Sequence, residues 1–398
     1  LPLQEIQEQA HDAPLIYLVA TSLGGMALIV NATGLKGIEL PDLTDTTMLR
    51  ALAGPDEKAP GGYLGAYGGW LNGDSNAFAV WSKALEETAH WLWEAVMSRV
   101  LAHLEAEEIS EAVLIPTGLL GLLPLHAAWI EDPSHPTGRR YALDHFTLTY
   151  APSAQALYHA RRGAIRPADT LLAVENPEGT LDYAEPEVKS VLSHFPGKYN
   201  HLLRDQAIEE NVKYAIGSSS VLHFSTHGQA GWQEAESSRL KLADDDLTLM
   251  ELFDLNLDQA RLAVLSACET GVPGIELPDE AVSLPSAWMQ AGVPGVVGSL
   301  WSVDDMSTAM LMARFYDLWR DEHLSPPQAL RRAQIWLRDS TVEDLLLQFK
   351  GCKQSGSVRM SAEAAKSFRK FDKIAWGDPD DRPFKDPFWW AAFAYTGL

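Results

Sequence analysis

Short apolar runs recur along this chain between stretches of helical patterning, and this alternation constrains the fold more than any other feature. The strand-like runs lie at 112–116, 145–150, 170–175, 221–226, 262–267 and 293–300. The helical segments between them lie at 152–161, 185–194, 206–216 and 281–291. Strands that alternate with helices form a mostly parallel sheet covered on both faces. The sequence therefore predicts an α/β fold with a mostly parallel sheet flanked by helices.

The first part of the chain follows a different pattern, which favours antiparallel strands and helices. Apolar runs at 15–21 and 25–31 flank a short turn, as in a β-hairpin, and residues 36–40 are expected to add a third strand. A short helix is expected at 45–54 and a long one at 76–107. Between these helices lies a glycine-rich segment.

The glycine-rich segment at 61–69 is expected to be a flexible loop. It lacks the Gly-Lys-Ser/Thr ending of a phosphate-binding loop. Nucleotide binding is therefore not expected there.

Two of the strand-like runs end in residues that can carry out nucleophilic chemistry. The run 221–226 is followed by His227 and Gly228, and the run 262–267 is followed by Cys268. The carboxyl ends of parallel strands meet at one edge of a sheet, where α/β proteins bind ligands. A cysteine attacks as the thiolate, and a nearby imidazole can take its proton. The sequence therefore predicts a thiol–imidazole site formed by His227 and Cys268.

Each of these residues also has a structural interpretation. A single cysteine at the end of an apolar strand is often a small buried hydrophobe, and a single histidine there is often structural. Because the two residues occupy equivalent positions after two similar apolar runs, we favour a catalytic role for both. Gly228 has no Cβ and lets a substrate approach the backbone closely. Its N–H and that of Cys268 are expected to form an oxyanion hole.

A second histidine, His223, lies on the same strand face as His227 because side chains alternate along a strand. We interpret it either as a core histidine or as one that supports the site residues from behind. A metal site formed by the two histidines is the weaker alternative, since no further Cys or acidic ligand stands at metal-binding spacing. Neither a metal nor another cofactor is expected.

The residues around His227 and Cys268 resemble the CHAT peptidases, clan CD relatives of the caspases and separases. The His-Gly pair followed 41 positions later by the Cys in Ser-Ala-Cys-Glu-Thr-Gly carries the resemblance. Four further motifs occur in the family's order: Ile115–Ala128, Tyr150–Ser153, Ala291–Asp305 and Trp389–Phe393. The resemblance covers about residues 110–398, and the segment 346–386, which is longer and more polar than in the family, has an open role.

The resemblance implies both an organisation and an activity. A caspase-like catalytic subdomain at 166–398 would follow an N-terminal pseudo-caspase or support subdomain at 1–165. His227 and Cys268 would form a catalytic dyad that hydrolyses peptide bonds of a partner protein. CHAT modules often follow TPR repeats or sensor regions in bacterial defence and cell-death systems, which implies an upstream regulatory domain or an activator protein. A catalytically silent scaffold and a thiol acyl transferase are the alternatives.

The substrate-binding residues are expected at the end of the strand at 293–300 and just beyond it, since the equivalent loops border the dyad in caspase relatives. They are Ser299, Trp301, Asp304 and Asp305. An acidic side chain there could bind a basic residue of the substrate. The favoured alternative is that the two aspartates only cap the following helix. Trp301 either stacks against substrate or fills the core.

Composition limits the partners. Lys and Arg number 31 against 54 Asp and Glu, a net charge of −23, so nucleic acids and anionic membranes are not expected partners. Two cysteines exclude a disulfide framework and suit a cytoplasmic location. Neither a signal peptide nor a membrane span is expected.

The chain begins with Leu1 and not with Met, so we expect a fragment or a processed product. The locally basic segment 350–374 is expected to be either a loop or an activation segment. The loop is favoured.

Overall fold

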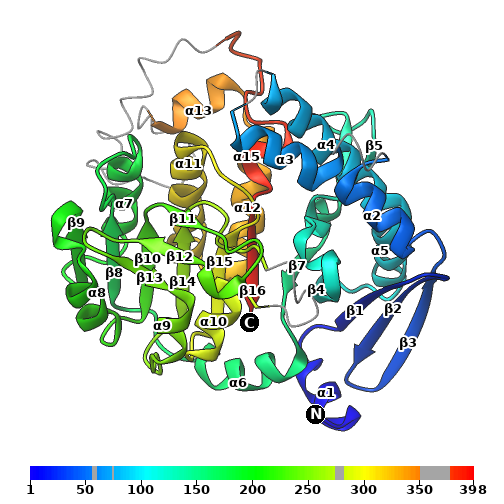
Figure 1. Ribbon diagram of the computed structural model, residues 1–398, viewed down its shortest axis with the longest axis horizontal. Helices are drawn as coiled ribbons and strands as arrows, with labels where there is room; N and C mark the ends of the chain where they lie inside the picture. Colours follow the sequence, from blue (N-terminus) through cyan, green and yellow to red (C-terminus); the bar gives the residue numbers. More distant parts are fainter. Residues whose placement is uncertain (56–60, 74–75, 274–281, 350–376) are drawn as a thin grey trace. The chain divides into compact units, whose positions relative to one another are not determined.

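The structure is a computed structural model that describes residues 1–55, 61–73, 76–273, 282–349 and 377–398. The described residues form two compact units, which divide between Gln155 and Ala156. Each unit contains a sheet with helices packed on it (Figure 1). The functional subdomains expected at 1–165 and 166–398 stay a prediction. The basic segment 350–374 lies outside the described residues.

The first unit is built on an N-terminal meander. Strand β1 (Leu15–Thr21) pairs antiparallel with β2 (Gly24–Asn31), which pairs antiparallel with β3 (Gly34–Leu40), so the predicted hairpin and third strand are confirmed. On its other side, β1 is parallel to β4 (Glu111–Pro116), and β4 is parallel to β7 (Thr147–Tyr150). A separate short hairpin joins β5 (Trp129–Glu131) to β6 (Arg139–Tyr141).

The helices of the first unit include the long one predicted at 76–107. It consists of α4 (Ala77–Leu92), a π-helical turn (Trp93–Met97) and α5 (Ser98–Ala106). The others are α1 (Leu3–Gln9), α2 (Asp45–Ala53) and α3 (Gly62–Leu71). A 3-10 turn at Gly118–Leu122 follows β4.

The expectation of a flexible loop at 61–69 is wrong, because this segment forms α3. Tyr63 and Tyr67 are buried, and the ring of Trp70 stacks on that of Trp81 with centroids 5.1 Å apart. A glycine costs a helix about 1 kcal/mol relative to alanine. Buried aromatic rings each remove a large apolar area from water, which offsets that cost. The spacing of the two tyrosines, four residues apart, was the helical signal.

The second unit holds the predicted parallel sheet. Its strand order is β16-β15-β14-β10-β8-β9, and all neighbours are parallel except the antiparallel pair β15 and β16. The strands are β8 (Leu171–Glu175), β9 (Tyr199–Leu203), β10 (Val221–Ser225), β14 (Leu262–Ser266), β15 (Gly295–Ser299) and β16 (Phe393–Gly397). Every residue of β8, β10, β14 and β15 is buried, as expected for a sheet covered on both faces.

Helices cover both faces of this sheet. On one face lie α7 (Ala184–Ser193), α11 (Asp305–Tyr316) and α12 (Pro326–Asp339), and on the other lie α9 (Leu249–Phe253) and α10 (Leu284–Gln290) (Figure 1). Further helices in the described part of the chain are α6 (Ala154–Ala164), α8 (Glu209–Ile216), α13 (Val342–Phe349) and α15 (Pro387–Trp390). The core lies between helices and strands, where Trp288 of α10 packs on Phe224 of β10. The predicted α/β fold is confirmed.

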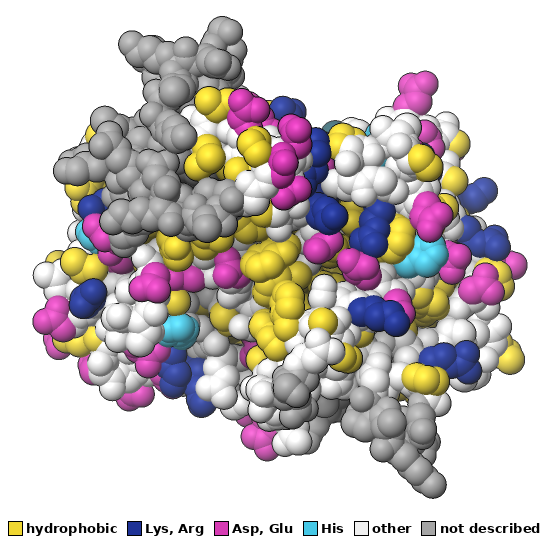
Figure 2. All heavy atoms as spheres, turned by 90° about the horizontal axis from the view of Figure 1, so that it is seen from above, with side chains coloured by type: hydrophobic (Ala, Val, Ile, Leu, Met, Phe, Trp, Pro, Cys, Tyr) yellow, Lys and Arg dark blue, Asp and Glu magenta, His cyan; other side chains and the backbone are white. Residues whose placement is uncertain are grey.

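The surface agrees with the acidic composition. Figure 2 shows Asp and Glu side chains scattered over the face in view, interspersed with Lys and Arg. Within the described ranges, no helix is both long enough and apolar enough to cross a membrane.

Candidate active site

His227 and Cys268 follow neighbouring strands at equivalent positions. Strands β10 and β14 are parallel and paired in register, with Ser225 opposite Ser266, and each candidate residue comes two positions after that pair. The backbone N–H of Thr226 donates to the carbonyl of Ser266 at 3.4 Å, so the two segments stay together beyond the strands. The structure therefore places His227 and Cys268 on adjacent segments at one edge of the sheet.

Gly228 packs directly against the cysteine segment. A Cβ added to Gly228 would lie 2.4 Å from the carbonyl oxygen of Cys268 and 3.2 Å from Cβ of Ala267. Real Cβ atoms do not approach a backbone oxygen so closely, so only glycine fits here. Glycine is needed here because the backbone of Cys268 lies so close to Gly228. The sequence analysis had instead explained this glycine by the close approach of a substrate.

The N–H of Gly228 points away from its strand partner. Gly228 begins β11 (Gly228–Gln229), which pairs antiparallel with β12 (Arg239–Lys241), itself paired with β13 (Asp246–Thr248). The carbonyl of His227 accepts from the N–H of Lys241 at 2.8 Å. Successive N–H groups of an antiparallel strand point in opposite directions, so that of Gly228 faces away from β12. This orientation suits the oxyanion hole that the sequence predicts, which stays a prediction.

The Cys268 thiol is held in its protonated form. Burial raises the pKa of Cys268, and the nearby carboxylates of Glu269 and Asp305 raise it further. Two hydrogen bonds to the sulfur lower the pKa of Cys268. One comes from the hydroxyl of Ser302, 3.3 Å from Sγ, and the other from the backbone N–H of Val303. Attack by this sulfur therefore requires a base, since the thiolate is the nucleophile.

The imidazole of His227 contacts a residue that the sequence analysis missed. Its Nε2 lies 2.7 Å from the hydroxyl of Thr180, in the loop after β8. Asn176 shapes this loop, with a φ of 47° and side-chain hydrogen bonds to the N–H and carbonyl of Leu181. The available signal was position, because Thr180 follows the strand that lies next to β10.

His223 is a core histidine, as interpreted from the sequence. Its side chain is fully buried, with Nε2 3.0 Å from a carboxylate oxygen of Glu187 and Nδ1 3.3 Å from the hydroxyl of Tyr316. The hydroxyl of Ser225 also donates to Glu187. Among the described residues, no cluster of potential metal ligands includes His223 or His227.

Two of the expected substrate-binding residues lie in the interior. Ser299 and Trp301 are both 0% exposed. The hydroxyl of Ser299 donates to the carbonyl of Ala267 at 2.6 Å, and the indole N–H of Trp301 donates to the carbonyl of Phe388 at 3.1 Å. Both side chains support the loops from within and offer no surface to a substrate. For Trp301, the structure supports the alternative that it fills the core.

The two aspartates stand at the start of α11. Asp304 caps the helix, because its Oδ1 accepts from the N–H of Ser307 at 2.8 Å, so the capping interpretation is confirmed for this residue. Asp305 accepts a hydrogen bond from the N–H of Tyr183 at 2.8 Å. Burial raises the pKa of Asp305 to about 6, although the bond from Tyr183 opposes the shift. A role of either residue in substrate binding stays a prediction.

Comparison with known proteins places this arrangement in a family. Residues 86–398 match the CHAT domain family. Two crystal structures of the Saccharomyces cerevisiae separase–securin complex share the fold, with TM-scores of 0.59 and 0.60 and identities of 10% and 11%. The matches cover 83% and 100% of this chain but 29% and 31% of the matched chain. A comparison with curated protein sequences gives no match.

A further solved structure, the Arg-specific cysteine proteinase gingipain R, is less similar. This protein, RgpB of Porphyromonas gingivalis, gives a TM-score of 0.42 at 11% identity. The match covers 80% of this chain and 68% of the RgpB chain.

The strand order and the helices on both faces define an α/β fold of the caspase-like kind that separase shares. The chain belongs to the CHAT domain family. It spans about three tenths of the separase chains that it matches, and identities near 10% establish a shared fold alone.

Proposed function

We propose that this protein is a regulated cysteine endopeptidase in which Cys268 is the nucleophile and His227 the base. One observation carries the proposal: the two residues follow in-register neighbours of a parallel sheet, with the Gly228 backbone packed against Cys268. Rigid strands position reacting groups well, because a displacement of about 1 Å can cost about 10²-fold in rate. Membership of the CHAT family supports the same chemistry.

The proposed reaction proceeds through a thioester. His227 takes the Sγ proton of Cys268 as sulfur attacks the peptide carbonyl, and the oxyanion accepts hydrogen bonds from the N–H groups of Gly228 and Cys268. The imidazolium then protonates the leaving amine as the C–N bond breaks. Water, deprotonated by His227, hydrolyses the thioester and regenerates the thiol. Removing one oxyanion donor typically costs about 10²–10³-fold in rate.

Thr180 acts in this scheme as a positioning residue. If Nε2–H of His227 donates to the Thr180 hydroxyl, the imidazole tautomer is set and Nδ1 keeps the lone pair that accepts the thiol proton. Partners of this kind fix both the tautomer and the orientation of a catalytic imidazole. The hydroxyl of Ser302 has a related role at the sulfur, because it donates a hydrogen bond that would stabilise the thiolate once it forms.

Replacing Thr180 with valine is expected to slow labelling of Cys268 by a reactive peptide probe about 10-fold to 100-fold, because the imidazole loses its orientation. The pH profile of the labelling rate should change as well, which a merely structural role would not cause. Thr180→Ser keeps the hydroxyl and should keep the rate. An unchanged rate and profile for Thr180→Val would remove Thr180 from the mechanism.

The raised pKa of Cys268 supports regulation, since a protonated thiol gives low basal activity. We infer that a partner protein or an upstream regulatory domain switches the enzyme on and that its substrate is a protein. Separase crystallises with securin, a protein partner of that enzyme. The resemblance to CHAT peptidases supports a cytoplasmic role in bacterial defence or cell death.

A panel of peptide acyloxymethyl ketones with basic, acidic or apolar terminal residues tests the proposed activity. These probes alkylate an activated cysteine at a peptidase site. We expect labelling of the parent chain, detected by mass spectrometry at Cys268, that is lost in both Cys268→Ala and His227→Ala. Labelling that persists in His227→Ala would favour simple thiol reactivity, and no labelling by any probe, even with candidate activators present, would favour the scaffold alternative. Products formed with added amines would separate hydrolysis from acyl transfer.

A further inference from the structure

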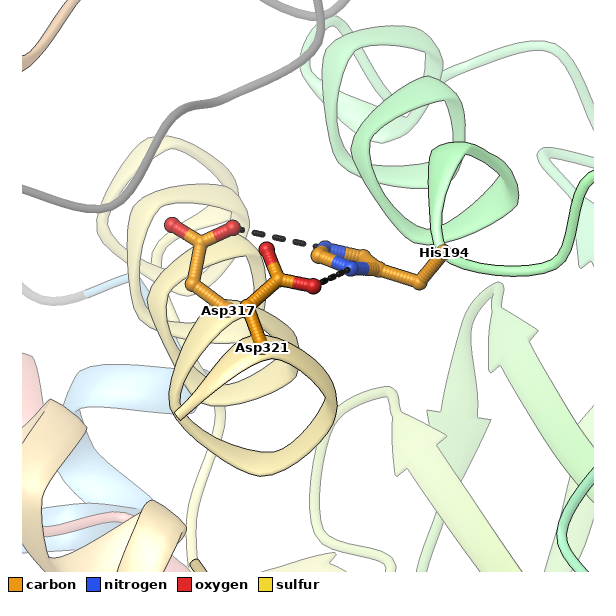
Figure 3. A group of neighbouring side chains, drawn as sticks. All are labelled: His194, Asp317 and Asp321. Carbon is orange, nitrogen blue, oxygen red and sulfur yellow. Dashed lines mark ion pairs between the residues drawn. The ribbon is translucent and has the colours of Figure 1, made fainter. Parts of the chain in front are cut away.

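Three ionisable side chains converge at one end of the helix pair α7 and α11, away from the proposed dyad. His194 is the C-cap of α7, and Asp317 and Asp321 are the first and last residues of the π-helical turn that follows α11. Figure 3 shows both carboxylates directed at the imidazole. Nε2 of His194 lies 3.3 Å from Asp317, and Nδ1 lies 3.4 Å from Asp321. Ligand atoms from the three residues all lie within 4.8 Å of one another.

Asp317 is the unusual member of this group. Its side chain is 1% exposed, and neither carboxylate oxygen receives a hydrogen bond from the part of the chain that the structure describes. Nε2 of His194 likewise forms no hydrogen bond there, although it lies within ion-pair distance of Asp317. A buried carboxylate without hydrogen bonds is costly, and buried polar groups are nearly always satisfied.

We propose that His194, Asp317 and Asp321 bind a divalent transition-metal ion such as Zn²⁺ or Mn²⁺. One imidazole nitrogen with two carboxylate oxygens is a donor set that suits these ions. Ligand atoms around a tetrahedral zinc ion lie about 3.3 Å apart, which matches the 3.3 Å between Nε2 of His194 and Asp317. Asp321 faces the other ring nitrogen, Nδ1, so its carboxylate must move toward Nε2 to join the same ion. The ligand atoms of the three residues lie up to 4.8 Å apart, and rotation of the Asp321 side chain would shorten these distances. The Asp321 side chain is 46% exposed, so it can move and an ion can enter from solvent.

The place of this site in the fold indicates a structural role. At the opposite ends of the same helices, the N–H of Tyr183, which precedes α7, donates to Asp305 in the first turn of α11, beside Cys268. Helix α7 has 10 residues and is therefore about 15 Å long, so an ion at His194 lies too far away to touch the reacting atoms. Instead, the ion would join the far ends of the two helices whose near ends border the cysteine.

Metal binding is best measured with both cysteines, Cys268 and Cys352, replaced by alanine, so that no thiolate competes for the ion. The chain is treated with chelator, dialysed and titrated calorimetrically with Zn²⁺ and, separately, with Mn²⁺. We expect one saturable site and a rise in Tm of roughly 5 °C at a hundredfold excess over Kd. Asp321→Asn, at a half-exposed position, should fold normally and weaken binding at least tenfold, as should His194→Gln.

The matched control is His201→Gln. His201 also pairs with a carboxylate, Glu175 at 2.7 Å, but among the residues that the structure describes no third ligand joins that pair, so metal binding should not change. Absence of saturable binding, or binding that survives in Asp321→Asn, would overturn the proposal and leave an imidazolium paired with two carboxylates. Binding lost equally in His201→Gln would also overturn it, because the ion would then be held elsewhere.

Discussion

Replacement of Cys268 by alanine is expected to abolish peptide cleavage and to leave the fold intact. The sulfur is the only nucleophile in the proposed mechanism, so cleavage should fall by about 10⁵-fold or more, to the background. The substitution removes one partly buried atom beside Ser302, and the stability cost should be about 1 kcal/mol. The measurement is kcat/KM on the peptide sequence that the probe panel selects, together with thermal unfolding.

The second cysteine provides the matched control. Cys352→Ala removes a thiol of the same type, and cleavage should be retained because the mechanism does not use it. If Cys268→Ala cleaves at a rate close to that of the parent chain, the nucleophile is another residue and the proposed function is wrong. If only Cys352→Ala is inactive, the strand-end site is not the site of reaction.

Replacing Gly228 with alanine is expected to have the next largest effect, through the backbone of Cys268. The added Cβ would lie 2.4 Å from the Cys268 carbonyl and 3.0 Å from Cγ2 of Thr270, so one of the two segments must move. Overpacking of this kind typically costs about 1–3 kcal/mol. Displacement of the nucleophile and of an oxyanion donor by about 1 Å should lower kcat/KM by about 10²-fold. Thermal unfolding and cleavage kinetics measure the two effects separately.

Gly217→Ala is the corresponding control. Gly217 caps α8 with a φ of −69°, and a Cβ there meets nothing within 4 Å. Its replacement should leave cleavage unchanged and stability equal or slightly higher, since alanine restricts the unfolded chain. Full activity in Gly228→Ala would contradict the close packing of the two segments and with it the proposed oxyanion hole.

The central sheet could be predicted because its strands are buried on both faces. Such strands appear in a sequence as continuous apolar runs. The ends of two of these runs, at Ser225 and Ser266, allowed the positions of His227 and Cys268 to be predicted. Strand β9 was missed because it lies at the edge and is partly exposed, so it lacks that signal. The three short strands after Gly228 are held by pairing with one another, and two or three residues show no periodicity.

The partners of the dyad depend on side-chain contacts that no sequence pattern encodes. Thr180 reaches His227 from a neighbouring strand's loop, 47 positions away, and Ser302 reaches Cys268 from a loop 34 positions away. Ser299 and Trp301 were expected to bind substrate because they lie at the end of a strand beside the dyad, with core filling as the alternative for Trp301. Both side chains are instead fully buried and donate hydrogen bonds to the carbonyls of Ala267 and Phe388.

The environment of the Cys268 sulfur also bears on the chemical lifetime of the protein. Peroxides oxidise the thiolate far faster than the thiol, and the higher oxidation states of cysteine are irreversible. Burial and two nearby carboxylates raise the pKa of this thiol, so its thiolate fraction and its rate of oxidation should be lower than those of an exposed cysteine. If Cys268 is the nucleophile proposed above, the raised pKa that lowers its basal reactivity would also protect its sulfur until the site is activated.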